Sequence, residues 1–334
     1  MYVNKTQRLH YIDIAKGILI LLLLVSHLGI ALKWCDIDDT NPNFLLWHYP
    51  QPLFTCFFMQ CFFIVSGYCS NFTVEGKTFS NKLARQLIIP WLFFELVRVV
   101  FFYSQGKNAQ LFPSPTFTTL WFLNALIFSK IICYAIYRLS KSTLLTVGIA
   151  LLLLVAGVTI NQLDGGGNCF NPLCYKQSLI DTFFVALGFL LKKYHAFDSK
   201  YLKYAGIIFI IIIIGRFLHI WSLPGQDADI GVGIIEIPFF LITSISGSLM
   251  FIYLCQKIAK NHFIEFYGRN SLIVYGLHMW PYLIIIAIIK NIITPTNQLN
   301  ALIFLFTIYS IEILFLFIFI RILNLKYIRI LIGK

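Results

Sequence analysis

Residues 14–32 read IAKGILILLLLVSHLGIAL, an apolar run that contains two ionisable side chains, Lys16 and His27. The run is long enough to cross the roughly 30 Å hydrocarbon core of a bilayer as a single α-helix. Lys16 and His27 are eleven residues apart, so both side chains lie on one face of that helix, about 16 Å apart along its axis. A charged group inside such a segment costs about 2.5–3.5 kcal/mol on insertion scales and usually serves a function. The pair therefore predicts a functional site within the membrane.

The rest of the chain has the same apolar character. Of its 334 residues 59% are hydrophobic and only 12% charged, and 33 are Phe and 17 Tyr, which differs strongly from a soluble globular domain. Runs long enough to span a bilayer recur along the chain. We place them at about 14–32, 53–72, 87–104, 118–137, 143–160, 179–192, 205–221, 236–255, 271–290 and 300–320. The sequence predicts an all-α membrane protein, a bundle of about ten transmembrane helices forming a single domain over residues 1–334.

The distribution of charge predicts how this bundle is oriented. Every second predicted loop is rich in Lys and Arg, and the loops between them carry aspartates instead. By the positive-inside rule, both termini are therefore expected in the cytoplasm. Most of the net charge of +12 follows from this topology, and no nucleic-acid-binding motif accompanies it, so nucleic acid is not an expected partner. No cysteine pair shows zinc-ligand spacing with histidine, so no metal is expected either.

Two predicted outer loops leave alternatives open. The loop 33–52 carries Trp34, Trp47 and His48, which suit either stacking on a sugar ring or an aromatic belt at the membrane surface. In the loop 161–178, Cys169 and Cys174 are close enough in sequence to form a small disulfide, and the sequence does not decide whether they do.

Several predicted helices contain polar residues besides Lys16 and His27. Glu95 and Arg98 are three residues apart, on one helix face, and this spacing predicts an internal ion pair. Asp181, His278 and Glu312 lie in other predicted helices. Any one of them is explained by a hydrogen bond between helices. Their number together predicts a polar cavity inside the bundle.

Short motifs follow one another along the chain in a characteristic order. They are Lys16…His27 in the first span, Phe62-Phe-Ile-Val-Ser66-Gly-Tyr68 in the second, Lys82-x-x-Arg85 in the next basic loop, Trp121-Phe-Leu123, and Tyr275…His278. In this order they resemble the membrane-bound acyltransferases of family 3, which are integral-membrane O-acetyltransferases of cell-surface sugars and polysaccharides. Positions 16 and 82 are lysines in this chain, whereas the family more often has arginine there.

The resemblance implies an acetyl-CoA co-substrate, a sugar or polysaccharide acceptor, and a location in the bacterial cytoplasmic (inner) membrane. It assigns the catalytic motif to His27 and Lys16, with His27 as the general base. Because imidazole is suited to proton transfer at neutral pH, His27 either deprotonates the acceptor hydroxyl or is itself acylated in a two-step route. Residues expected to bind the coenzyme phosphates are Lys82, Arg85 and Arg8. Residues expected to line the substrate cavity are Ser66, Glu95, Arg98, Trp121 and His278.

A second class of protein fits the same composition. A secondary transporter or flippase for a sugar or lipid-linked glycan would also have many helices and buried charges. That class predicts two related halves with helices broken at matching positions, and the sequence shows no such symmetry. The acceptor glycan, its hydroxyl, the acyl chain length and the oligomeric state stay open.

Overall fold

A computed structural model describes residues 9–37, 41, 50–104, 106, 120–164, 171–223, 232–293 and 295–333. This part of the chain is helical and contains no β-strand, which confirms the predicted all-α membrane bundle. The predictions made for Arg8, Trp47, His48 and Cys169 concern residues outside these ranges and stay predictions.

The described part of the chain contains fourteen α-helices and one π-helical turn. They are α1 (His10–Lys33), α3 (Gln51–Thr55), α4 (Phe58–Tyr68), α5 (Gly76–Leu83), the π-helical turn η2 (Ala84–Ile88), α6 (Ile89–Ser104), α7 (Trp121–Ser140), α8 (Thr143–Leu163), α9 (Tyr175–Lys193), α10 (Leu202–Phe217), α11 (Ile237–Lys257), α12 (His262–Arg269), α13 (Ser271–Leu277), α14 (Met279–Ile289) and α15 (Gln298–Leu323). Short 3₁₀ turns precede α9, α10 and α11, and another follows α15.

Each of the ten predicted spans contains helix over most of its described residues. Within the described ranges, eight helices or continuous helix runs have the length and hydropathy to cross a membrane. The pair α13 and α14 forms a further candidate span that is bent by 51°. The predicted span 205–221 corresponds to α10, which has 16 residues. The total of ten crossings therefore stays a prediction.

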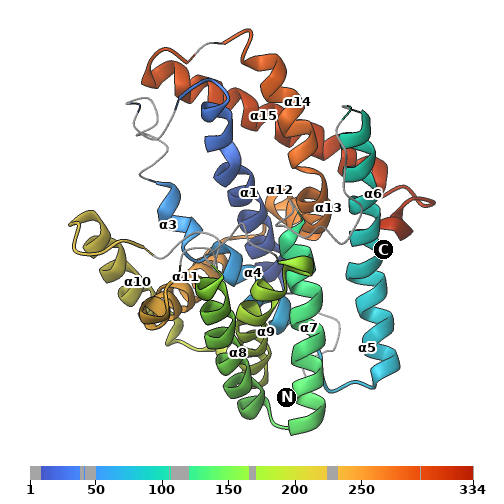
Figure 1. Cartoon of the computed structure of the whole chain (residues 1–334), viewed down its shortest axis with the longest axis vertical. Coiled ribbons are helices and arrows are strands. Elements are labelled where there is room, and N and C mark those ends of the chain that lie inside the picture. The colour runs from blue at the N-terminus through green and yellow to red at the C-terminus, as the bar shows by residue number, and fades with distance from the viewer. Residues whose placement is uncertain are drawn as a thin grey trace.

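Helix α1 runs through the middle of the bundle in Figure 1, with α5 and α6 on one flank and α10 and α11 on the other. It contacts α4, α11, α12, α13 and α15. Its closest approach is to α12, because glycines allow the two backbones to touch. A Cβ at Gly17 would lie 2.1 Å from the Ile264 carbonyl oxygen, and one at Gly268 would lie 1.8 Å from that of Asp13. This contact fixes the end of α1 that carries Lys16.

Glycines also bring α4 and α9 together. A Cβ at Gly67 would lie 2.0 Å from the Val185 carbonyl oxygen, and one at Gly188 would lie 2.0 Å from that of Ile64. Small residues at a helix contact are the usual way in which membrane helices approach closely. Gly67 therefore serves the packing of α4 against α9.

Two prolines explain irregular helices at positions that matter for the site. Pro281 has no N–H to offer the Leu277 carbonyl, and its ring crowds that carbonyl, so the helix breaks between α13 and α14. His278 lies at the break. Pro90 follows the π-helical turn η2, whose wider ring removes the need for an N–H at that proline. Both irregular segments lie beside the cavity described next.

Candidate active site

A cavity of about 340 Å³ lies between α1, α4, the α5–η2 segment, α7 and α13. Its volume falls within the range of about 300–1,000 Å³ that is common for ligand pockets. The wall comes from helices that are distant in sequence, from α1 at one end of the described chain to α13 near the other. The cavity is thus a product of the tertiary fold.

Helix α1 contributes one stripe of side chains to the wall. Lys16, Ile20 and Leu23 line the cavity, and their spacing of four and then three residues keeps them on one helix face. His27 is the next residue on that stripe, about 6 Å further along the axis than Leu23. His27 is therefore one helical turn beyond the deep end of the cavity.

The imidazole of His27 stacks on the imidazole of His278. The ring centroids are 5.0 Å apart and the ring planes meet at 23°. His278 is buried, with 2% of its surface exposed, and its Nδ1 lies 2.7 Å from the Tyr275 carbonyl oxygen. A carbonyl only accepts a hydrogen bond, so Nδ1 carries the proton and Nε2 of neutral His278 keeps its lone pair. Nε2 is buried and has no hydrogen-bond partner in the described part of the chain.

Tyr275 connects this histidine pair with the cavity. Its side chain lines the cavity, and its hydroxyl accepts a hydrogen bond of 3.1 Å from the Phe122 backbone N–H. The Phe122 ring also lines the cavity and packs edge-on against Tyr275, with 5.3 Å between centroids. The Tyr275 ring centroid also lies 5.9 Å from that of His278. Tyr275, with Phe122 packed against it, therefore forms a layer between the cavity and the imidazole pair.

Tyr282, one turn after His278, holds the backbone of His27. Its hydroxyl donates a hydrogen bond of 2.5 Å to the His27 carbonyl and accepts one of 3.1 Å from the Ala31 N–H. These are the two backbone groups that pair with each other in a regular α-helix. The side chain of Tyr282 is fully buried. The bent α13–α14 pair thus fixes both the ring and the backbone of His27.

The cavity wall is basic. Among the described residues, three lysines line it, Lys16 from α1, Lys82 from α5 and Lys130 from α7, and no Asp or Glu does. Lys130 lies close enough to Lys16 for the two charges to interact. Sequence reasoning missed Lys130, although it is a lysine in the middle of the apolar span 118–137, which is the criterion that singled out Lys16.

The cavity wall has both polar and apolar parts. Asn71, Lys82 and Gln86 contribute polar side chains, whereas Leu23 and Phe62 contribute apolar ones. Ser66 also lines the wall, on the same face of α4 as Phe62 and Cys69. The cavity can therefore hold a ligand with a charged, polar part and an apolar part.

Arg85 is not in this cavity but in a recess beside it. The recess has a volume of about 300 Å³ and shares Lys82 and Gln86 with the main cavity. Lys82 therefore stands between the two spaces, and Arg85 marks the outer one. The predicted pair Lys82 and Arg85 is brought together by the α5–η2 segment.

Three other predicted cavity residues lie outside the wall. Glu95 and Arg98 form the ion pair that their spacing predicts, with 2.8 Å between Oε2 and Nε, and both side chains are buried. Trp121 is buried beside Phe122 but does not line the cavity. Glu95 is close enough to interact electrostatically with Tyr275. The ion pair is thus a neighbour of the layer that contains Tyr275.

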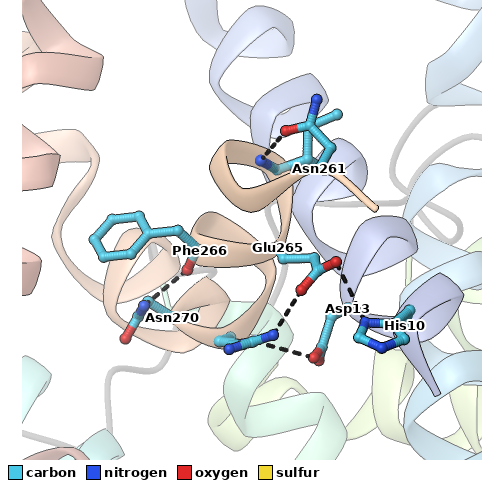
Figure 2. A network of polar contacts seen from close by, with 8 residues as sticks. His10, Asp13, Asn261, Glu265, Phe266 and Asn270 are labelled. Carbon is cyan, nitrogen blue, oxygen red and sulfur yellow. Dashed lines mark hydrogen bonds and ion pairs between the residues drawn. The ribbon is translucent and has the colours of Figure 1, made fainter. Parts of the chain in front are cut away.

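A polar network joins the start of α1 to α12 (Figure 2). Arg269 lies 3.3 Å from Asp13 and 2.6 Å from Glu265, and Glu265 also lies 3.3 Å from His10. Asp13 is 4% exposed and Glu265 1% exposed, so Arg269 neutralises two buried carboxylates. The network fixes the end of α1 that precedes Lys16.

Fold and site together define a multi-pass membrane protein whose basic cavity ends beside a pair of histidines. The chain belongs to the acyltransferase family: a family model described as an acyltransferase domain matches residues 9–321, nearly the whole chain. No curated protein and no solved structure shows a significant match. The family match supports acyltransferase activity, the first of the two classes considered from the sequence.

Proposed function

We propose that this acyltransferase moves an acetyl group from cytoplasmic acetyl-CoA to a sugar hydroxyl of a cell-surface polysaccharide or its lipid-linked precursor, in the bacterial inner membrane. One observation supports the proposal most: the stripe of α1 that lines the three-lysine cavity continues one helical turn further to His27, which stacks on His278. A basic cavity attracts an anionic donor, and the histidines stand where the far end of that donor would arrive.

The polarity of the cavity supports coenzyme A as the donor. The coenzyme has phosphates at one end and a thioester at the other, joined by an uncharged pantetheine arm. We expect the phosphates to bind at the lysines and the acetyl thioester to lie against apolar side chains of the wall such as Leu23 and Phe62. The axial distance of about 16 Å from Lys16 to His27 is comparable to the length of the extended arm. The thioester must pass the layer of Phe122 and Tyr275 to reach His27.

In the proposed reaction, His27 acts as the general base. It takes the proton of the acceptor hydroxyl while the hydroxyl oxygen attacks the thioester carbonyl carbon. The carbon–sulfur bond then breaks, the acetyl ester remains on the acceptor, and coenzyme A leaves as a thiolate. The imidazolium of His27 returns its proton to that thiolate, so the enzyme ends in its starting state.

We propose that His278 orients His27 for this step. Its Nδ1 proton is committed to the Tyr275 carbonyl, and its ring faces that of His27. Because the two rings stack, His278 restricts the rotation of the His27 imidazole. Tyr282 adds a second restraint through the His27 carbonyl.

The proposal is tested with purified protein in detergent and acetyl-CoA labelled in the acetyl group. Release of free coenzyme A thiol, together with transfer of the label to surface glycan or its lipid-linked precursor, is the expected result. Uptake of a glycan into vesicles without any thioester cleavage would contradict the proposal and favour a transporter. Mass spectrometry of surface glycans from cells with and without the gene then identifies the acetylated hydroxyl.

A further inference from the structure

We propose that Lys16 and Lys130 together form a binding site for the diphosphate of the acyl donor, inside the cavity and apart from Lys82 and Arg85. This inference rests on the proposed function, because it assigns part of the proposed donor to named side chains. Lys130 lies outside all the sequence motifs that resemble the family.

The two lysines approach each other from different helices. Lys16 is in α1 and Lys130 is near the middle of α7, and both line the same cavity. Each side chain is only partly exposed, and their charges are close enough to interact. Two ammonium groups in a cavity within the membrane repel each other more strongly than they would in water. An anion between them adds two attractions that offset this repulsion.

No acidic side chain of the described structure supplies that anion. The cavity wall contains neither Asp nor Glu, and no carboxylate in the described ranges forms an ion pair with Lys16 or Lys130. The nearest acidic residue along α1, Asp13, is paired with Arg269 instead. The two charges are therefore available for a ligand that enters the cavity.

The chemistry of coenzyme A selects which phosphate this site holds. The pantetheine arm is attached directly to the diphosphate, whereas the third phosphate is on the ribose at the far end. An arm that reaches from the level of Lys16 toward His27 places the diphosphate at Lys16 and Lys130. The ribose phosphate then lies further out, near Lys82 and the recess that contains Arg85. Lysine ammonium groups are common phosphate ligands.

The test measures the affinity of the detergent-purified protein for coenzyme A and for dephospho-coenzyme A, which lacks only the ribose phosphate. Calorimetric titration is done with the wild type, Lys130→Met, Lys130→Arg, Lys82→Met and the control Lys141→Met, which changes an exposed lysine at the end of the same helix. Each titration is repeated with added phosphatidylglycerol, which distinguishes a lipid headgroup from the donor diphosphate as the anion.

Lys130→Met is expected to weaken the binding of both coenzymes about 10- to 100-fold. Lys130→Arg is expected to retain most of the affinity. Lys82→Met is expected to weaken the binding of coenzyme A but not that of dephospho-coenzyme A. Lys141→Met is expected to leave the binding of both unchanged. Unchanged affinity in Lys130→Met, a loss confined to coenzyme A, or competition by the lipid that disappears in Lys130→Met would overturn the inference. Wild-type binding of coenzyme A without acetyl transfer would instead contradict the proposed function and leave the phosphate site standing.

Discussion

The imidazole rings of His27 and His278 stack with 5.0 Å between their centroids, although one lies in the first helix and the other at the break between α13 and α14. This contact gives His27 a fixed neighbour in a position where a lone histidine could rotate. It also brings together the first and the last of the sequence motifs. The pair stands one helical turn beyond a cavity lined by three lysines.

Replacing His278 by Ala tests whether the stack orients His27. Because His278 does not line the donor cavity, we expect kcat to fall at least about 10-fold while the KM for acetyl-CoA is unchanged. The matched control is His195→Ala, since the side chain of His195 is 81% exposed. Equal kcat values for His278→Ala and the wild type would show that His27 needs no partner.

Tyr282→Phe removes one hydroxyl and leaves the ring in place. That hydroxyl makes hydrogen bonds to both His27 and Ala31, so the variant should lose about 1–3 kcal/mol of stability, at about 0.5–1.5 kcal/mol for each bond. We also expect kcat to fall several-fold with the KM for acetyl-CoA unchanged. Tyr267→Phe is the control, because its hydroxyl donates to the Ile313 carbonyl at 2.9 Å, away from the cavity. If both variants lose stability and neither loses kcat, Tyr282 has only a structural role.

Much of the fold and part of the site follow from sequence pattern. The apolar runs predicted the helices, and helical spacing placed Lys16 and His27 on one face because that spacing depends only on the geometry of one helix. The contact of His27 with His278 could not be predicted in this way, since it depends on how α1 packs against the α13–α14 pair. Lys130 could have been identified from the sequence, because it is a lysine inside an apolar run. The helix break at His278 could also have been predicted, because Pro281 follows it.

Gly17→Ala tests the close contact of α1 with α12. An added Cβ would lie 2.1 Å from the Ile264 carbonyl oxygen, so the two helices would have to move apart, at a cost of about 1–3 kcal/mol. Gly148→Ala in α8 is the matched control, because nothing lies within 4 Å of a Cβ added at that position. There the better helix propensity of alanine should give up to about 1 kcal/mol of stabilisation. Thermal unfolding in detergent compares the two, and equal melting temperatures would contradict the packing described here.

Arg269→Met tests the network at the start of α1 (Figure 2). It would leave two buried carboxylates, Asp13 and Glu265, without their shared cation. Loss of one partner of a fully buried ion pair typically costs about 3–5 kcal/mol. Because the Arg269 side chain is itself 43% exposed, we expect a smaller loss, of about 1–3 kcal/mol. Arg138→Met, at the exposed end of α7, should cost less than about 1 kcal/mol. A small effect of Arg269→Met on the melting temperature would show that the network contributes little to holding α1.

The most direct test of the central claim is the rate of acetyl transfer by His27→Ala, measured beside its affinity for coenzyme A. If His27 is the general base at the end of the donor cavity, transfer of label from acetyl-CoA should fall by about 100-fold or more. Coenzyme A affinity should stay within about twofold of the wild type, because His27 does not line the cavity. The exposed-histidine control, His195→Ala, should retain both. Transfer by His27→Ala at the wild-type rate would contradict the account.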